Sequence, residues 1–278
     1  MNGSAAPLYG GQSTSRVTIH DLAAAKARGE RWPMLTAYDA STATILDEAG
    51  IPVLLVGDSA ATVIYGYDNT IPVTTDELLP LVRGVVRGSR RALVVADLPF
   101  GSYQSSVAQA IDTGSRFLKD GLAHAVKLEG GTAVLDQVRA MTAAGIPVMA
   151  HLGLTPQSVH QLGGYSVQGR GDAGKRIIED ALLLQDAGAF ALVLEVVPSD
   201  LATHVTNLLR IPVIGIGAGN GTDAQVLVIH DLVGLTRGHT AKFVKPYAQL
   251  GDTMRAAVQA WSADVAAQVY PSAEHSYS

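Results

Sequence analysis

Short apolar runs alternate with helical patterns along most of this sequence. In the clearest copies a helical stretch ends in Ala-Gly, Ile-Pro-Val follows, and the apolar run then stops at a polar residue; these copies begin at Ala49 and Ala144. Glycine ends helices in the left-handed conformation, and proline is tolerated at the first position of a strand because its missing N–H is not needed there. The repeat therefore indicates successive strand–helix units.

Eight apolar runs have the length of strands, and most are continuously apolar, as is typical of parallel strands covered by helices. They are residues 34–38, 53–57, 93–97, 125–129, 148–151, 191–195, 213–217 and 226–230. Helical patterns lie between them, for example 75–87, where Thr74 and Glu77 have the spacing of a capping box, and 175–187. Eight such units predict an α/β fold with one closed (β/α)8 barrel (a TIM barrel); an open doubly wound sheet is the alternative.

The segments outside the repeat complete this prediction. We expect the helical stretch 19–28 to cap the bottom of the barrel and the stretch 253–269 to form the last helix. Residues 1–15 are rich in Gly, Ser and Ala and lack the basic and apolar regions of a signal peptide. The predicted organisation is a mobile N-terminal tail over 1–15, a barrel domain over 16–270 and a C-terminal tail over 271–278.

Composition narrows the class of partner. The formal net charge is −5 and Lys and Arg form no runs, which argues against a sequence-independent grip on nucleic acid. No apolar stretch has the roughly 20 residues of a membrane span. The chain has no cysteine, which excludes disulfides and thiolate metal ligands. We therefore predict a cytoplasmic protein that acts on small molecules and binds neither nucleic acid nor membrane.

Barrel enzymes carry their chemistry at the carboxyl ends of the strands, so the residues that end the runs are the candidates. These are Tyr38 and Asp39, Asp58 and Ser59, Asp97, Lys127 and Glu129, His151, Glu195, a glycine-rich segment over 215–221, and His230 and Asp231. A single Asp or Ser at such a position commonly caps the next helix. Several carboxylates with a lysine and a histidine on one rim favour an active site instead.

Asp58 and Asp97 end neighbouring strands, so their carboxylates can share one small cation, and an oxygen-only ligand set favours Mg²⁺. Such an ion leaves positions for water and for the two oxygens of a chelating 2-oxo acid. Lys127 and Glu129 face the same side of one strand, where they could neutralise the substrate carboxylate and hold metal-bound water. A mutual ion pair between Lys127 and Glu129 is the alternative.

Glu195 stands between two apolar runs, a setting that suits a general base; a buried acid paired with a cation is the alternative. His151 could bond to the substrate or support the metal ligands, or it could be a structural core histidine.

Two glycine-rich segments have more than one interpretation. Residues 169–174 match G-x-G-x-x-G, but no strand precedes them, so we assign them to a long connection that forms a mobile lid or rim. Residues 215–221 do follow a strand and could bind phosphate or allow close packing against the folate or the substrate.

Eight motifs of this chain resemble those of the ketopantoate hydroxymethyltransferase family (3-methyl-2-oxobutanoate hydroxymethyltransferases), and they cover most of its length. They are LTAYD (35–39), VGDS (56–59), ADLPF (96–100), VKLEGG (126–131), HLGLTPQSV (151–159), GYSVQGRG (164–171), LEVVP (194–198) and IGIGAG (214–219). One departure is Tyr67, where many family members have His. The departure leaves a substrate role for this position open.

The resemblance implies a reaction and a set of roles. Asp58 and Asp97 would ligate Mg²⁺ with Glu129 near the ion, and Asp58, Ser59, Asp97 and Lys127 would contact the 2-oxo acid. Glu195 would remove the C3 proton of 3-methyl-2-oxobutanoate, and the magnesium-stabilised enolate would attack the methylene carbon of 5,10-methylenetetrahydrofolate to give ketopantoate. The family also implies a homo-oligomer, typically a decamer.

Two other functions fit the same predicted fold. A magnesium-dependent enolate lyase or mutase of the phosphoenolpyruvate and isocitrate lyase kind would use the same barrel, but such enzymes usually carry a Cys-containing catalytic loop. A barrel that has lost catalysis and serves as a binding subunit is the second alternative.

Overall fold

The computed structural model describes residues 7–8, 15–238 and 240–277. Eight parallel strands pair in sequence order and close into a barrel, which confirms the predicted fold class. The strands are β1 (Trp32–Thr36), β2 (Val53–Val56), β3 (Leu93–Asp97), β4 (Ala125–Glu129), β5 (Val148–Gly153), β6 (Ala191–Glu195), β7 (Val213–Ile216) and β8 (Ala224–Leu227).

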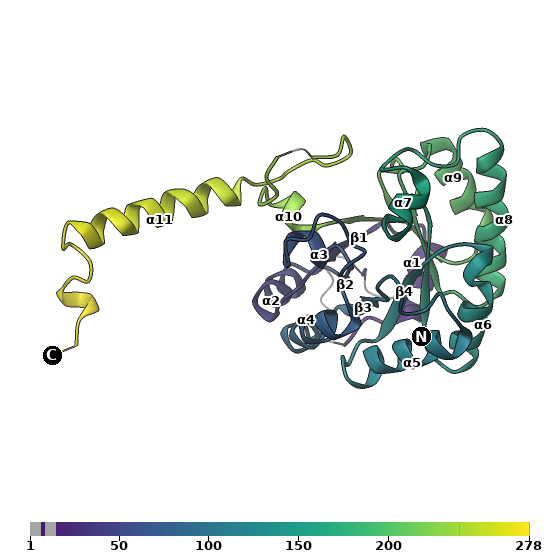
Figure 1. Ribbon diagram of the computed structural model, residues 1–278, viewed down its shortest axis with the longest axis horizontal. Coiled ribbons are helices and arrows are strands. Elements are labelled where there is room, and N and C mark those ends of the chain that lie inside the picture. Colours follow the sequence, from purple (N-terminus) through teal and green to yellow (C-terminus); the bar gives the residue numbers. More distant parts are fainter. Residues whose placement is uncertain (1–6, 9–14, 239, 278) are drawn as a thin grey trace. The chain divides into compact units, whose positions relative to one another are not determined.

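Helices cover the outside of the barrel (Figure 1). The longer ones are α2 (Ala40–Glu48), α4 (Thr75–Gly88), α5 (Val107–Lys119), α6 (Leu135–Ala143), α8 (Asp172–Asp186) and α9 (Ser199–Leu208). At the start of α4 the Thr74 side chain accepts from the Glu77 backbone N–H and the Glu77 side chain accepts from the Thr74 N–H, so the predicted capping box is present.

Short helices occupy several connections. They are α3 (Ala60–Val63), α7 (Val159–Leu162) and the 3₁₀ helices η1 (Thr132–Val134) and η2 (Pro156–Ser158). Two of these, η2 and α7, lie in the connection between β5 and α8, which is the predicted lid. The first half of this connection is therefore helical. Its mobility stays a prediction.

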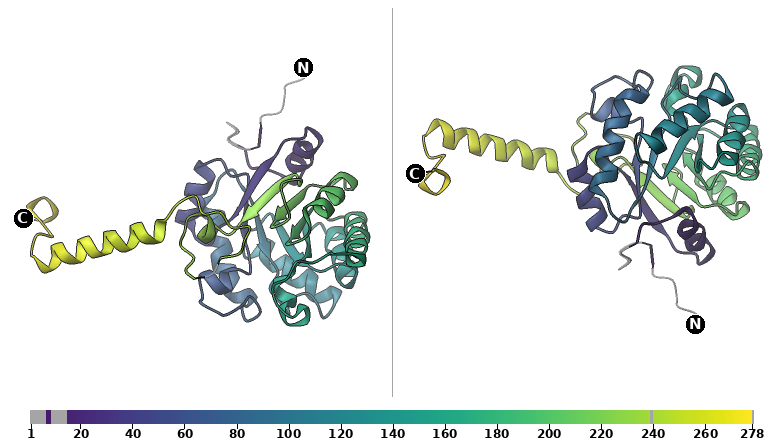
Figure 2. Two further views of the ribbon diagram at one scale, coloured as in Figure 1. Left: turned by 90° about the horizontal axis from the view of Figure 1, so that it is seen from above. Right: turned by 90° about the horizontal axis from the view of Figure 1, so that it is seen from below.

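Helix α1 (Ile19–Ala27) closes the bottom of the barrel, as predicted. Its Leu22 and Ala25 are fully buried and belong to the core cluster that includes the inward residues Met34, Leu93 and Val226. Figure 2 shows α1 beyond one end of the strands. Because α1 closes this end, the active site is expected at the opposite end, where the carboxyl ends of the strands lie.

The structure corrects the bounds of the last strand. We expected residues 226–230, but β8 is Ala224–Leu227, and helix α10 (Ile229–Leu232) follows it. The prediction placed the start of the strand after Gln225 because this residue is polar. In the structure Gln225 belongs to the strand, since it pairs with Pro33 of β1 and with Gly215 of β7.

The chain divides into two compact units, Met1–Val228 and Ile229–Ser278. All eight strands lie in the first unit, whereas the last long helix, α11 (Leu250–Ala266), and the 3₁₀ helix η3 (Ala273–His275) lie in the second. This division differs from the single domain predicted over 16–270. Within the described ranges no helix combines the length and hydropathy that a membrane span needs.

The predicted N-terminal tail lies mostly outside the described residues. Leu8 is an exception, since its side chain is buried and belongs to the core cluster. Its N–H donates to Glu30 Oε1 and its carbonyl accepts from the Arg91 guanidinium. At this position, therefore, the segment packs against the barrel.

Candidate active site

On β3 to β6 the inward positions form an apolar core below and a polar layer above. On β4, Ala125, Lys127 and Glu129 share the inward face because side chains alternate along a strand. Ala125 belongs to the core cluster, whereas Lys127 and Glu129 line a cavity of about 110 Å³. The polar layer thus lies at the carboxyl end of the barrel.

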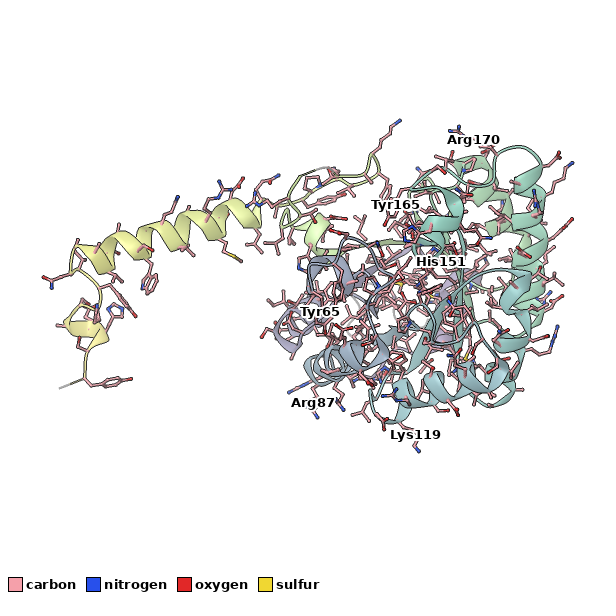
Figure 3. All side chains as sticks on the ribbon, viewed as in Figure 1. Tyr65, Arg87, Lys119, His151, Tyr165 and Arg170 are labelled. Carbon is pink, nitrogen blue, oxygen red and sulfur yellow. The ribbon has the colours of Figure 1, made fainter. Side chains whose placement is uncertain are left out.

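All the predicted substrate, metal and base residues line this one cavity: Asp58, Ser59, Asp97, Lys127, Glu129, His151 and Glu195. The strand register brings them together, since Lys127 is the Cα partner of Asp97 and Glu129 is the partner of His151. His151 lies inside the barrel in Figure 3. The sequence prediction that these strand ends converge is therefore confirmed in position, while their roles remain predictions.

Lys127 is the buried cation of the cavity. Its Nζ lies 2.9 Å from Asp97 Oδ1 and 3.6 Å from Glu129 Oε1. Burial lowers the pKa of Lys127, but the carboxylates of Asp97, Glu129 and Asp58 outweigh that effect and raise its pKa above the ordinary value. The ammonium is therefore charged at neutral pH. The ion pair left open as the alternative for Lys127 and Glu129 is present, although Asp97 is the nearer partner.

His151 connects two acids. Its Nδ1 lies 3.2 Å from Glu129 Oε1, and its Nε2 lies 3.3 Å from Glu195 Oε2. Burial and the Lys127 charge lower the pKa of His151, but its contacts with Glu129 and Glu195 raise it to about 9. A protonated imidazole can thus hold Glu195 at the edge of the cavity, where 16% of the Glu195 side chain is exposed.

The carboxylates outnumber the cations. Burial, and then the charges of Asp97 and Glu129, raise the pKa of Asp58 well above its ordinary value. Burial also raises the pKa of Asp97, although Lys127 opposes this. For Glu129 the effect of burial is outweighed, mainly by Lys127, and its pKa is lowered. An added divalent cation beside Asp58 and Asp97 would relieve this crowding of negative charge.

The donor set fits Mg²⁺. Asp97 Oδ1 and Glu129 Oε1 are buried carboxylate oxygens, the first 2.9 Å from Lys127 Nζ and the second 3.2 Å from His151 Nδ1. Oxygen ligands of this kind are the ones that Mg²⁺ prefers, usually with one or two carboxylates and several waters. No group of three or more His, Cys, Asp or Glu side chains is arranged to hold a metal by itself within the described ranges. Direct ligation by Asp58, Asp97 and Glu129 together stays a prediction.

Gln157 is a residue of this site that sequence reasoning missed. Its side chain is 3% exposed. Its Nε2 donates to Asp58 Oδ2 at 3.1 Å and to the Leu98 carbonyl at 3.0 Å, and its backbone N–H donates to Glu129 Oε2 at 3.0 Å. Two acceptors facing Nε2 fix the orientation of the amide. One residue of η2 thereby holds both Asp58 and Glu129.

Tyr103 supports Gln157 from the β3–α5 connection. Its hydroxyl donates to Gln157 Oε1 at 2.8 Å and accepts from the Glu129 N–H at 3.2 Å. Neither residue ends a strand, which is why a search of strand ends passed over them. Gln157 lies in a motif that carries the family resemblance, and that is the only sequence signal that could have drawn attention to it.

Four other candidate residues are not among those that line this cavity. Asp39 caps α2, since its Oδ1 accepts from the Thr42 N–H at 2.9 Å. His230 and Asp231 belong to α10 in the second unit. Tyr67 is partly exposed and donates to Glu77 Oε1 at 2.7 Å. The helix-cap interpretation therefore describes Asp39, and the prediction that 230 and 231 end a barrel strand was wrong.

The glycines at 219 and 221 allow helix α9 to approach the β7–β8 connection. A Cβ on Gly219 would lie 2.4 Å from Ser199 Cβ, and one on Gly221 would lie 2.0 Å from Thr203 Oγ1. Both partners belong to α9. This approach of α9 is a structural role for the two glycines, and the two interpretations of the segment as a ligand contact stay predictions.

Fold and site together define a (β/α)8-barrel enzyme whose polar cavity lies at the carboxyl ends of its strands. The sequence model of the ketopantoate hydroxymethyltransferase family matches residues 16–273. A 3-methyl-2-oxobutanoate hydroxymethyltransferase of Frankia casuarinae is 62% identical over 279 residues, which are 98% of this chain and 94% of that protein. The one from Rhodococcus jostii is 62% identical over 94% of this chain and 91% of that protein. The chain belongs to the ketopantoate hydroxymethyltransferase family and is a transferase.

Solved structures with the same barrel are more distant in sequence. A 2,3-dimethylmalate lyase of the PEP mutase/isocitrate lyase superfamily superposes with a TM-score of 0.56 at 17% identity, over 88% of this chain and 86% of that one. A phosphonopyruvate hydrolase complexed with oxalate and Mg²⁺ gives a TM-score of 0.58 at 14% identity, over 92% of each chain. At this identity the likeness shows the fold alone.

Proposed function

We propose that this enzyme transfers a hydroxymethyl group from 5,10-methylenetetrahydrofolate to 3-methyl-2-oxobutanoate, giving 2-dehydropantoate (ketopantoate) for pantothenate and coenzyme A synthesis. The observation that carries the proposal is the single cavity that holds the buried Asp58, Asp97 and Lys127 with Glu195 at its edge. Membership of the family supports the choice of both substrates.

Asp58 and Asp97 would hold Mg²⁺, with Glu129 reaching the ion directly or through water. When bound, the ion supplies positive charge that attracts the keto and carboxylate oxygens of the 2-oxo acid and acidifies its C3 hydrogen. Lys127 binds the substrate carboxylate and stabilises the charge that develops on the keto oxygen. Ser59, whose Oγ lies 2.8 Å from Tyr38 Oη, and His151 orient the substrate.

Glu195 accepts the C3 proton. His151 Nε2 lies beside Glu195 Oε2, so the imidazole keeps this carboxylate directed at the cavity. The resulting enolate attacks the methylene carbon of the folate, a C–C bond forms, and both bonds from that carbon to the two folate nitrogens are broken, with the C3 proton and one proton of water going to those nitrogens. One water supplies the hydroxyl group, and tetrahydrofolate leaves, so that atoms balance.

The proposal extends to the assembly and its setting. We place the enzyme in the cytoplasm, with small-molecule partners and neither nucleic acid nor membrane. We also propose a homo-oligomer, and a decamer is the expectation from the family resemblance. An exposed apolar stripe on α11, formed by Leu250, Met254, Val258, Trp261 and Val265, supports self-association.

Proton NMR of 3-methyl-2-oxobutanoate in D₂O tests the enolisation step without folate. Wild-type enzyme with Mg²⁺ should remove the C3 proton signal, EDTA should stop the loss, and Glu195→Gln should abolish it while Mg²⁺ binding persists. If exchange needs the donor in place, adding 5,10-methylenetetrahydrofolate should give ketopantoate. Exchange in Glu195→Gln at the wild-type rate would remove Glu195 from the base role, and no turnover with both substrates would overturn the function. Cleavage of an isocitrate-like acid would favour the lyase instead.

A further inference from the structure

The wall of the active-site cavity has two chemically different arcs. Its charged side chains all come from the carboxyl ends of β2 to β6. At the level of these charged groups, β7 and β8 contribute the apolar side chains of Ile216 and Val226, whereas Leu55 and Val193 line the cavity one layer deeper. No charged side chain of β1, β7 or β8 lines the cavity in the described part of the chain.

The strand register orders these groups around the barrel. Glu129 pairs with His151, Glu195 of β6 pairs with Ile216 of β7, and Val226 lies on β8. A path around the wall therefore runs from Lys127 through His151 to Glu195, and continues to Ile216 and Val226. Glu195 stands at the boundary between the charged arc and the apolar arc.

A branched 2-oxo acid has the same order of chemistry along its length. Its carboxylate and keto oxygens need positive charge, its C3 carries the hydrogen that a base removes, and its alkyl branches need an apolar surface. If the oxygens face Lys127 and C3 faces Glu195, the branches extend past Glu195 toward Ile216 and Val226. Leu55 and Val193 lie one layer below the charged groups, whereas Ile216 is level with Glu195. At the level of the charged groups the alkyl branches therefore meet Ile216 and Val226.

We infer that Ile216 and Val226 form the alkyl-recognising wall of this cavity and limit the size and polarity of the groups on C3. The inference rests on the proposed function and deepens it, because it assigns the specificity for branched monocarboxylic 2-oxo acids. A second carboxylate on C3 would be buried against Ile216 and Val226 without a partner, which is costly. The same wall therefore rejects 2-oxo dicarboxylates.

The test compares Ile216→Ala and Val226→Ala with wild type on two acids, 3-methyl-2-oxobutanoate and the one-methylene-longer 3-methyl-2-oxopentanoate. Exchange of the C3 hydrogen in D₂O with Mg²⁺ gives kcat/KM for each acid. The kcat/KM ratio of the longer to the shorter acid should rise about 10- to 200-fold in the variants, the range that one methylene contributes in an apolar pocket. An unchanged ratio in both variants would overturn the inference.

Ile214→Ala is the matched control. Ile214 lies on the same strand and the same inward face as Ile216, one layer deeper, where it is fully buried and does not line the cavity. This variant should lose stability but keep the wild-type ratio, so a ratio that rose equally in Ile214→Ala would show a loosened core and contradict the inference. If Ile216→Ala does not fold, Ile216→Val replaces it, and the kcat/KM ratio of the longer to the shorter acid should then rise by a smaller factor.

Binding separates this inference from the proposed function. Calorimetric titration of each acid into the Mg²⁺-loaded proteins reports recognition even where no exchange occurs. Suppose wild type binds the shorter acid without exchanging its C3 hydrogen, and the variants gain affinity for the longer acid. This result would support the role of Ile216 and Val226 and overturn the proposed reaction. Wild type that binds neither acid would overturn both.

Discussion

Among individual residues, Gln157 has the contacts of a positioning residue for the cation site. It uses the side-chain amide on Asp58 and the backbone N–H on Glu129. The Asp58 oxygen that accepts from the amide is Oδ2, so Gln157 leaves Oδ1 free of this bond. Hydrogen-bond partners of this kind fix the direction in which a ligand presents its lone pairs.

Gln157→Met should weaken Mg²⁺ binding about 10- to 100-fold, the usual cost of losing such a partner. Methionine keeps the length and volume of the side chain but cannot donate to Asp58. Calorimetric titration of Mg²⁺ measures the effect, and the melting temperature is recorded beside it. The matched control is Gln168→Met in the same connection, where the amide donates only to Ser166.

A purely structural role for Gln157 would give a different result. The melting temperature of Gln157→Met would fall while the Mg²⁺ affinity stayed at the wild-type value. That outcome would remove Gln157 from the positioning role and leave it as a buried packing residue.

Among the helices, α2 and α4 pack closely on the outside of the barrel. Thr44 of α2 donates from Oγ1 to the Gly88 carbonyl at 2.9 Å. A Cβ on Gly88 would lie 2.2 Å from the Ala40 carbonyl oxygen, so no side chain fits there without moving the helices. Gly84, one turn earlier in α4, has ordinary space, since its Cβ would lie 3.6 Å from Ala40 N.

The two glycines of α4 should therefore respond in opposite directions to the same substitution. Gly88→Ala should lower the free energy of unfolding by about 1–3 kcal/mol, because overpacking forces a backbone shift. Gly84→Ala should raise it by up to about 1 kcal/mol, because alanine has the higher helix propensity. Urea denaturation measures both, and equal effects in the two variants would show that the contact with Ala40 does not limit the packing.

In the molecule as a whole, the second unit carries an apolar surface. On α11 the side chains of five residues recur three or four positions apart and are 42–56% exposed: Leu250, Met254, Val258, Trp261 and Val265. Such spacing places them on one face of the helix. An exposed apolar stripe of this kind marks a protein–protein contact, and the proposed homo-oligomer supplies a second copy as the partner.

The double variant Val258→Lys/Trp261→Lys should therefore reduce the assembly to smaller species, because two charges would be buried at the contact. Sedimentation velocity measures the mass of wild type and variant. The control is Ala256→Lys/Ala263→Lys, which adds the same charge on the opposite face of α11 and should keep the wild-type mass. A wild-type monomer, or a double variant on the stripe that assembles like wild type, would contradict the prediction.

The sequence by itself determined the barrel and most of the site. Buried parallel strands must be apolar on both faces, and their ends must be marked by Gly, Pro or polar residues, so the runs could be counted. Asp58, Asp97, Lys127, Glu129, His151 and Glu195 could be found because each lies at a strand end and all strand ends of a parallel barrel meet at one rim.

Only the tertiary structure decided what depends on contacts between distant segments. Gln157 meets Asp58 across 99 residues, and no local pattern encodes such a meeting of two connections. The start of β8 depended on backbone pairing with β1 and β7 rather than on the polarity of Gln225. The two arcs of the cavity likewise follow from strand register, because register, unlike periodicity, is set only when the barrel closes.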